Sequence, residues 1–141
     1  MLVAIDGSTY AAKALDYAVG LAEKCSASIN IIHIVPEIDF LMSRLEPSKS
    51  QFVKYINEGL EEAGRTILSE SEKTVKTSNI NVATFLKHGD TAEKIIETAD
   101  EVKADLIVVG QKGLGFGEGF SLGSVVHKVS QQAKCPILII K

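Results

Sequence analysis

The chain has 141 residues, of which 45% are hydrophobic and 23% charged, so it is long enough for one domain with a hydrophobic core and is not of the disordered class. Its formal net charge of −3, with no basic stripe, disfavours binding to the phosphate backbone of nucleic acids. No apolar run approaches the roughly 18 residues that a membrane span needs.

The chain opens with Met1, a short apolar run and Asp6-Gly7-Ser8, without the basic region that begins an export signal. We therefore expect a cytoplasmic protein. Cys25 and Cys135 are far apart, stand among apolar neighbours and form no CxxC pair. We expect both to be buried, reduced thiols.

Five short apolar runs rich in β-branched residues are expected to be strands, at 2–5, 29–35, 82–86, 106–109 and 137–140. Amphipathic segments separate them. Their apolar stripes are Ala11, Leu15, Ala18 and Ala22 in the first, Phe52, Ile56, Ala63 and Ile67 in the second (48–77), and Leu122, Val125, Val126, Val129 and Ala133 in the fourth. The third begins at Asp90, with Glu93 three residues later, in a capping-box pattern.

Strand and helix alternate along the chain, which predicts βαβ crossovers and a parallel sheet covered by helices on both faces, a three-layer α/β sandwich. In such folds ligands bind beyond the carboxyl ends of the strands, where the strand order reverses. Asp6, Val35, Lys87 and Gly110 each end or follow an expected strand. Their loops should therefore line that crevice.

Six of the eleven glycines lie between Gly110 and Gly123, in the segment that follows the fourth expected strand and opens the last helix. Glycine permits a positive φ and close approach of backbone N–H groups to a ligand, and a helix start favours phosphate. We therefore expect a phosphate cradle rather than a plain connector. Ser124 would donate its hydroxyl to the ligand there, or serve only as a helix cap.

Two common phosphate motifs are absent from the sequence. No glycine is followed by Lys-Ser or Lys-Thr, as a P-loop requires, and the first strand ends in Asp6-Gly7-Ser8 instead of the dinucleotide fingerprint Gly-x-Gly-x-x-Gly. A receiver domain needs acidic residues before its strand-end aspartate, and residues 1–5 contain none. A flavodoxin-like FMN protein stays an alternative, although only Ser8, Thr9 and Tyr10 suit its phosphate loop.

The spacing that fits is Gly110-x2-Gly113-x9-Gly123-Ser124. It resembles the nucleotide-binding signature of the universal stress protein family, Gly-x2-Gly-x9-Gly-Ser/Thr. The resemblance covers the whole chain, since His33-Ile34 closes the second expected strand and Cys135-Pro136 precedes the last. It implies one nucleotide-binding domain over residues 1–141, with a Rossmann-like five-stranded parallel sheet of order 3-2-1-4-5.

The resemblance also implies a site for ATP in the family's ATP-binding branch. Ala4, Asp6 and Ile34 would border adenine and ribose, and magnesium would be held mainly by phosphate oxygens. The residues implied to contact ribose and phosphates are Gly110, Gln111, Lys112 and Gly113, and those implied to hold the phosphate tail are Gly123, Ser124 and Val125. Members often carry a basic residue where this chain has Leu114, so AMP and ADP stay as alternative ligands.

Single side chains leave further alternatives open. Asp6 would orient the ribose or a metal-bound water, or would cap the turn into the first helix beside Ser8. We expect His33 to be a hydrogen-bonded core residue, and His88 and His127 to lie on a loop and a helix surface. No Ser-His-Asp or Cys-His set and no metal-ligand spacing can be assembled. The resemblance implies a nucleotide-dependent stress-response switch or sensor, and without such a catalytic set we expect at most a slow ATPase or nucleotide hydrolase.

Two segments point to protein contacts. Residues 136–141 would form an apolar edge strand, which invites pairing with a second copy, and the family resemblance also implies a homodimer. Ile38, Phe40, Leu41, Met42 and Leu45 are apolar for a loop and are expected to form a lid or partner surface, or to fold into the core or the dimer interface.

Overall fold

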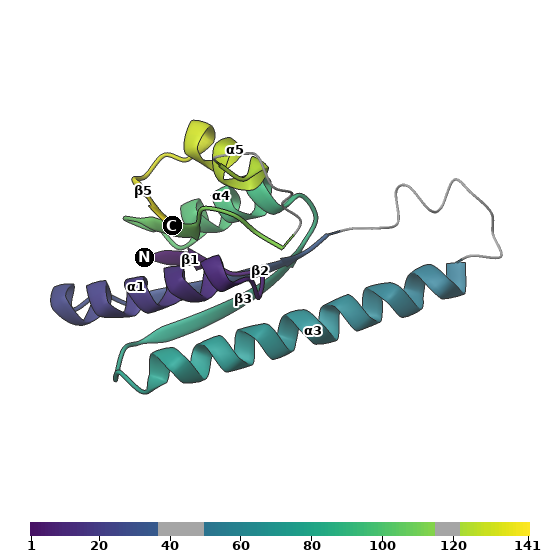
Figure 1. The fold of residues 1–141 in the computed structure, drawn as a ribbon, viewed down its shortest axis with the longest axis horizontal. Coiled ribbons are helices and arrows are strands. Elements are labelled where there is room, and N and C mark those ends of the chain that lie inside the picture. Colours follow the sequence, from purple (N-terminus) through teal and green to yellow (C-terminus); the bar gives the residue numbers. More distant parts are fainter. Residues whose placement is uncertain (37–49, 115–121) are drawn as a thin grey trace.

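The structure is a computed structural model that describes residues 1–36, 50–114 and 122–141. It contains nine helices and strands within those ranges, and they alternate as expected (Figure 1). In chain order they are β1 (Leu2–Ala4), α1 (Thr9–Cys25), β2 (Ile29–Val35), α3 (Ser50–Lys76), β3 (Val82–His88), α4 (Thr91–Glu101), β4 (Ile107–Gly110), α5 (Ser124–Gln132) and β5 (Ile137–Ile140). The expected lid at 38–45 lies outside the described residues.

The five strands form one parallel sheet of order β3-β2-β1-β4-β5, which confirms the expected topology. The short central strand β1 pairs with both neighbours, since Leu2 is in register with Asn30 of β2 and with Ile107 of β4. The chain runs outward from β1 to β3 and then returns to β4. The strand order therefore reverses between β1 and β4, the position at which ligands bind in such sheets.

Alternate residues of the central strands enter two separate cores. Val3, Ile31 and Val108 pack with α1 and α3, whereas Leu2, Ile32 and Ile107 pack with α4 and α5. Figure 1 shows α4 and α5 together on one side of the sheet. Burial on both faces explains why these strands are continuous apolar runs rather than alternating ones.

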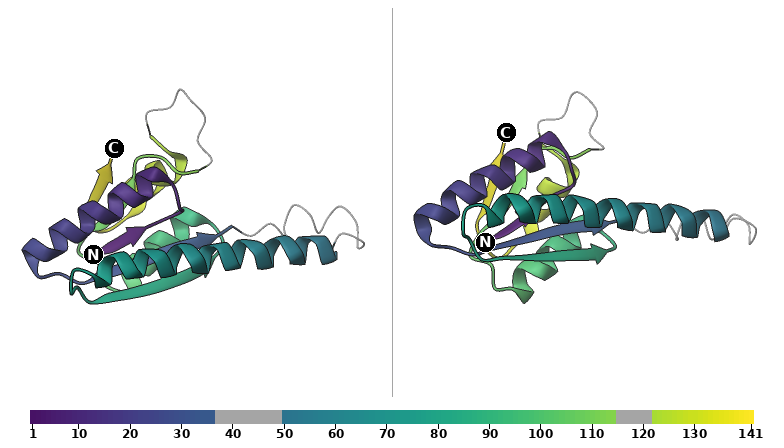
Figure 2. Two further views of the ribbon diagram at one scale, coloured as in Figure 1. Left: turned by 60° about the horizontal axis from the view of Figure 1, so that its bottom comes forward. Right: turned by 90° about the horizontal axis from the view of Figure 1, so that it is seen from below.

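The apolar stripe expected on the helix at 48–77 is wrong by one residue. The buried residues of α3 are Val53, Gly64, Leu68 and Val75, of which Leu68 and Val75 belong to the core on this face of the sheet. Phe52 is 58% exposed, because α3 packs along β2 and β3 while its N-terminal end projects beyond them (Figure 2). Ala63 is exposed and Ile67 half-buried, and both line a cavity, while Ile67 also packs at the border of the core formed with α1 and α3.

The expectation for the cysteines is half wrong. Cys25 is the last residue of α1 and is exposed, because the helix turns Ala22 inward and leaves Cys25 on the outer face. Cys135 is half-buried against the core formed with α4 and α5, and both thiols are free. Among the described residues, no helix is long and apolar enough to cross a membrane.

Candidate functional site

A cavity of about 510 Å³ opens at the carboxyl ends of β1, β2 and β4, where the strand order reverses. Nine of the ten residues expected in the site line it, which are Ala4, Asp6, Ile34, Gly110, Lys112, Gly113, Gly123, Ser124 and Val125. These residues come from four separate stretches of the chain. The volume lies within the 300–1,000 Å³ that small-molecule sites typically occupy.

The tenth residue, Gln111, lies beside the cavity without lining it. Its N–H donates to the carbonyl of Ile140 at 2.7 Å, and its own carbonyl accepts from the N–H of Gly123 at 3.0 Å. Gln111 thus joins the end of β4 to β5 and to the start of α5. Its backbone fixes the spacing between the two glycine positions that face the cavity.

The two ends of the cavity differ in chemistry. At the end formed with α3, its walls are Ile5, Pro36, Leu60, Ala63 and Ile67, with His33 among them. At the other end the walls are the segment after β4 and the first turn of α5. An apolar group such as a planar ring suits the first end. An anion suits the second, because the first N–H groups of a helix have no partner inside it.

His33 is a polar side chain in the apolar end of the cavity. Its Nδ1 lies 2.9 Å from the carbonyl oxygen of Ile5, so that nitrogen carries the hydrogen. A hydrogen-bonded histidine was expected, but it is half-buried and lines the cavity rather than the core. Gly64 of α3 makes room for the ring, since a Cβ there would lie 2.7 Å from its Cδ2.

The helix α5 begins without a side-chain cap. Its N-cap is Gly123, with φ −67° and ψ 148°, and within the described part of the chain no side-chain hydrogen bond caps the first turn. Ser124 is therefore the first helical residue and not the cap, so that reading of its hydroxyl is wrong. It is exposed and lines the cavity.

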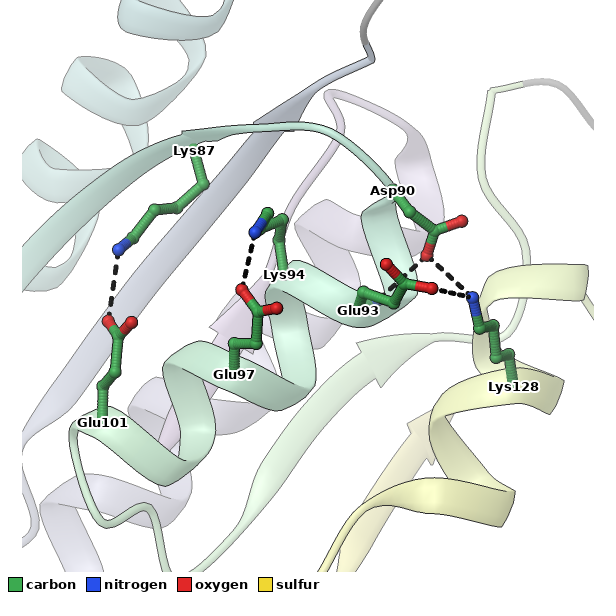
Figure 3. A network of polar contacts seen from close by, with 7 residues as sticks. All are labelled: Lys87, Asp90, Glu93, Lys94, Glu97, Glu101 and Lys128. Carbon is green, nitrogen blue, oxygen red and sulfur yellow. Dashed lines mark hydrogen bonds and ion pairs between the residues drawn. The ribbon is translucent and has the colours of Figure 1, made fainter.

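The helix α4 starts close by and is capped by its own sequence. Asp90 accepts the N–H of Glu93 at 2.9 Å, which confirms the first half of the expected capping box. The carboxylate of Glu93 pairs with Lys128 of α5 at 2.9 Å, and Lys128 also reaches Asp90 at 3.1 Å (Figure 3). The hydrogen bond from Glu93 N–H, together with Lys128, lowers the pKa of Asp90 below its ordinary value.

The structure gives a packing reason for the first glycine of the signature, which the sequence did not reveal. A Cβ on Gly110 would lie 2.7 Å from backbone and side-chain atoms of Tyr10, so this glycine lets α1 pack closely on β4. Neither Gly113 nor Gly123 has a positive φ, so of the two expected reasons for glycine only the close approach of the backbone stays open for them. The rest of the glycine run, 115–121, lies outside the described residues.

Asp6 stabilises the turn into α1, which is one of the two roles expected for it. Its Oδ1 accepts the N–H of Ser8 at 2.9 Å, and Ser8 in turn caps α1 by accepting the N–H of Ala11 at 3.2 Å. Its Oδ2 accepts the N–H of Leu114 at 2.9 Å, a contact between the end of β1 and the segment after β4. Within the described ranges, no group of three or more His, Cys, Asp or Glu side chains could hold a metal ion.

Comparisons with known proteins agree on one family. The model of the universal stress protein family matches residues 1–141. The universal stress protein YxiE of Bacillus subtilis is 37% identical over 144 residues, which cover 100% of this chain and 97% of that protein. The chain therefore belongs to the universal stress protein family.

Solved structures share its fold. Universal stress protein UspA from Lactobacillus plantarum superimposes with a TM-score of 0.88 at 22% identity, covering 99% of this chain and 95% of that one. A universal stress protein solved in complex with cAMP is 28% identical, with a TM-score of 0.68, and the match covers 99% of this chain and 93% of that one.

Proposed function

We propose that this universal stress protein binds an adenine nucleotide, ATP first and AMP or ADP as alternatives, and acts as a stress-response switch with slow or no hydrolysis. The observation that carries the proposal is the two-ended cavity, which collects nine of the ten expected residues from distant parts of the chain. The relative that was solved with cAMP supports a nucleotide as the class of ligand. We take residues 1–141 as one nucleotide-binding domain, and its location in the cytoplasm stays a prediction.

The proposed orientation follows from the chemistry of the two ends. Adenine and ribose would lie beside Ala4 and Ile34, next to the apolar wall from α3. The phosphates would lie against Gly113 and the start of α5, where the backbone N–H groups and the positive end of the helix dipole favour an anion. Lys112 lines this end and supplies a positive charge.

Magnesium fits this arrangement only through the ligand. Both oxygens of Asp6 already accept backbone N–H groups, and the described residues offer no cluster of ligating side chains. The ion would therefore be held by phosphate oxygens, and the charge it supplies would offset that of the triphosphate.

Slow turnover follows from the same contacts. A general base must accept a proton from the attacking water, and phosphoryl transfer also needs cations on the developing charge. The charged side chains lining the described part of the cavity are Asp6 and Lys112, and Asp6 is engaged by two N–H groups. Binding without prompt hydrolysis would let occupancy by ATP control the protein's partners.

The first test is to denature the purified protein and to identify any released nucleotide by mass spectrometry. Calorimetry with ATP, ADP and AMP then ranks the ligands, and single-turnover measurements with magnesium give the rate. We expect ATP to bind and to persist over many minutes. Failure of all three nucleotides to bind would overturn the proposal, and turnover near the roughly 10 per second of a typical enzyme would overturn the switch.

We also propose a homodimer through β5, which is an edge strand with half-buried Ile137, Leu138 and Ile139. Carbonyls of Pro136 and Ile140 accept from the β4 side, so by alternation Ile137 and Ile139 present their N–H groups to the free edge. Ile139→Pro removes one such donor and should convert the dimer to a monomer in light scattering. A monomeric wild-type protein at micromolar concentration would contradict the proposal.

A further inference from the structure

We propose that Asp6 is a positioning residue, a carboxylate latch that holds residues 111–114, which follow β4, against the end of β1. Asp6 and Leu114 are 108 residues apart, yet Oδ2 of Asp6 accepts the N–H of Leu114 at 2.9 Å. The other oxygen, Oδ1, is held by the N–H of Ser8 at 2.9 Å. The carboxylate is thus fixed from the α1 side and in turn fixes the segment that forms the phosphate end of the cavity.

The latch explains why residue 113 is glycine. A Cβ on Gly113 would lie 2.5 Å from Oδ2 of Asp6, and among the described residues the one other atom it would meet within 4 Å is the carboxyl carbon of the same residue. The φ of Gly113 is not in the left-handed region, so alanine could adopt this backbone. The obstacle to a side chain at this position is therefore Asp6.

Two acceptor oxygens are what this position requires. A carboxylate accepts on both sides, whereas the nearly isosteric amide of asparagine has one acceptor and one donor. In Asp6→Asn the NH₂ group must face one of the two backbone N–H groups. The variant therefore breaks one of the two contacts of Asp6 at almost constant shape, and Asp16→Asn on the exposed face of α1 is the matched control.

The latch is tested first in the ligand-free protein, by hydrogen exchange of the Ser8 and Leu114 amides measured by NMR. We expect exchange in Asp6→Asn to accelerate about tenfold or more at the Ser8 or the Leu114 amide, whichever the NH₂ group faces, as for loss of one charge-assisted hydrogen bond. In Asp6→Ala, which has neither acceptor, both amides should exchange faster, and in Asp16→Asn neither should change. Unchanged exchange at Leu114 in a folded Asp6→Ala variant would overturn the proposal.

A double-mutant cycle tests the link to Gly113. Gly113→Ala should reduce the folded-to-unfolded ratio in urea by about tenfold in the wild-type background, where the new Cβ meets Asp6. In Asp6→Ser the space is open, and the same change should cost less than about twofold. Equal costs in both backgrounds would overturn the latch. Gly20→Ala is the control, because a Cβ there meets no atom within 4 Å.

A third experiment measures ligand affinity and rests on the proposed nucleotide binding. If Asp6 acts through the segment that holds the phosphates, Asp6→Asn should weaken ATP about tenfold and adenosine less than twofold. Equal losses for ATP and adenosine would show direct contact with the ribose and would overturn the positioning role. If wild-type protein binds neither ligand, the proposed function fails, while the exchange and urea measurements still decide on the latch.

Discussion

Two helices on the same face of the sheet, α4 and α5, begin beside the same cavity and are treated in opposite ways. The N-terminus of α4 is occupied by the protein's own carboxylate, since Asp90 accepts the N–H of Glu93. That of α5 begins at Gly123, with no side-chain cap, and its first turn from Gly123 to Val126 lines the cavity. Thr91 and Ile95 of α4 line the cavity as well, so position alone does not separate the two helix starts.

The difference indicates where a phosphate would bind. A helix start that already holds a carboxylate repels a second anion, and one of its N–H groups already donates a hydrogen bond. Lys128 strengthens this distinction, because Asp90 and Glu93 hold its ammonium group on the α4 side (Figure 3). At the start of α5 the positive end of the helix dipole stays available to a bound anion. Adding a capping carboxylate to α5 should therefore remove the phosphate-binding end of the cavity.

The largest effect is expected from giving α5 the cap that α4 has. Gly123→Asp is compatible with φ −67° and ψ 148°, which any residue can adopt. Its carboxylate should accept an N–H of the first turn and lower ATP affinity by about a hundredfold, while the folded state is maintained or stabilised. Calorimetry and thermal unfolding measure the two effects.

Two variants at the same position separate the causes. Gly123→Asn supplies an uncharged cap and should give an intermediate loss, whereas Gly123→Ala supplies none and should retain affinity within severalfold. Loss of binding in the alanine variant as large as in the aspartate variant would mean that space, not capping, governs this position.

The sequence predicted the topology well because both of its signals are local. The alternation of apolar runs and amphipathic segments, and the family spacing from Gly110 to Gly123, are visible without tertiary contacts. The shift in α3 could not be seen, because an apolar side chain on a helix suits a core and a cavity wall equally. Leu68 is buried in the core, whereas Ile67 packs at its border and also lines the cavity, and only the packed structure separates them.

The candidate site shows the same limit. The sequence identified its glycines but assigned them all to contacts with ribose and phosphates, because contacts between residues far apart in the chain carry no local pattern. The packing of Gly110 on Tyr10 and of Gly113 on Asp6 are contacts of this kind. The exposure of Cys25 was missed for a related reason, since its apolar neighbours lie on another face of α1.

A smaller effect is expected at the capped helix. Asp90→Ala should lower the free energy of unfolding by about 1 kcal/mol at neutral pH, the usual value of an N-cap, and leave ATP affinity within about twofold. Because the folded pKa of Asp90 is lowered, its charge contributes stability above the unfolded pKa and loses that contribution as the pH falls below about 4. Asp90→Asn keeps a cap, so it should remove only this acid-dependent part. Urea unfolding at several pH values checks both variants.

The smallest effect is expected at the ion pairs that join the two helices. Lys128 carries hydrogen bonds to Glu93 and Asp90, which raise its pKa, but it lies at the surface, where solvent and salt screen such pairs. Lys128→Met should therefore lower the midpoint of thermal unfolding by less than Asp90→Ala does, and the difference from wild type should vanish in about 1 M salt, where the Debye length is about 3 Å. The effect of Lys128→Met on ATP affinity should stay below about twofold, because the carboxylates of Asp90 and Glu93 hold the ammonium group. If Lys128→Met weakens ATP as much as Gly123→Asp does, the lysine serves the phosphate end of the cavity, and the distinction between the two helix starts is wrong.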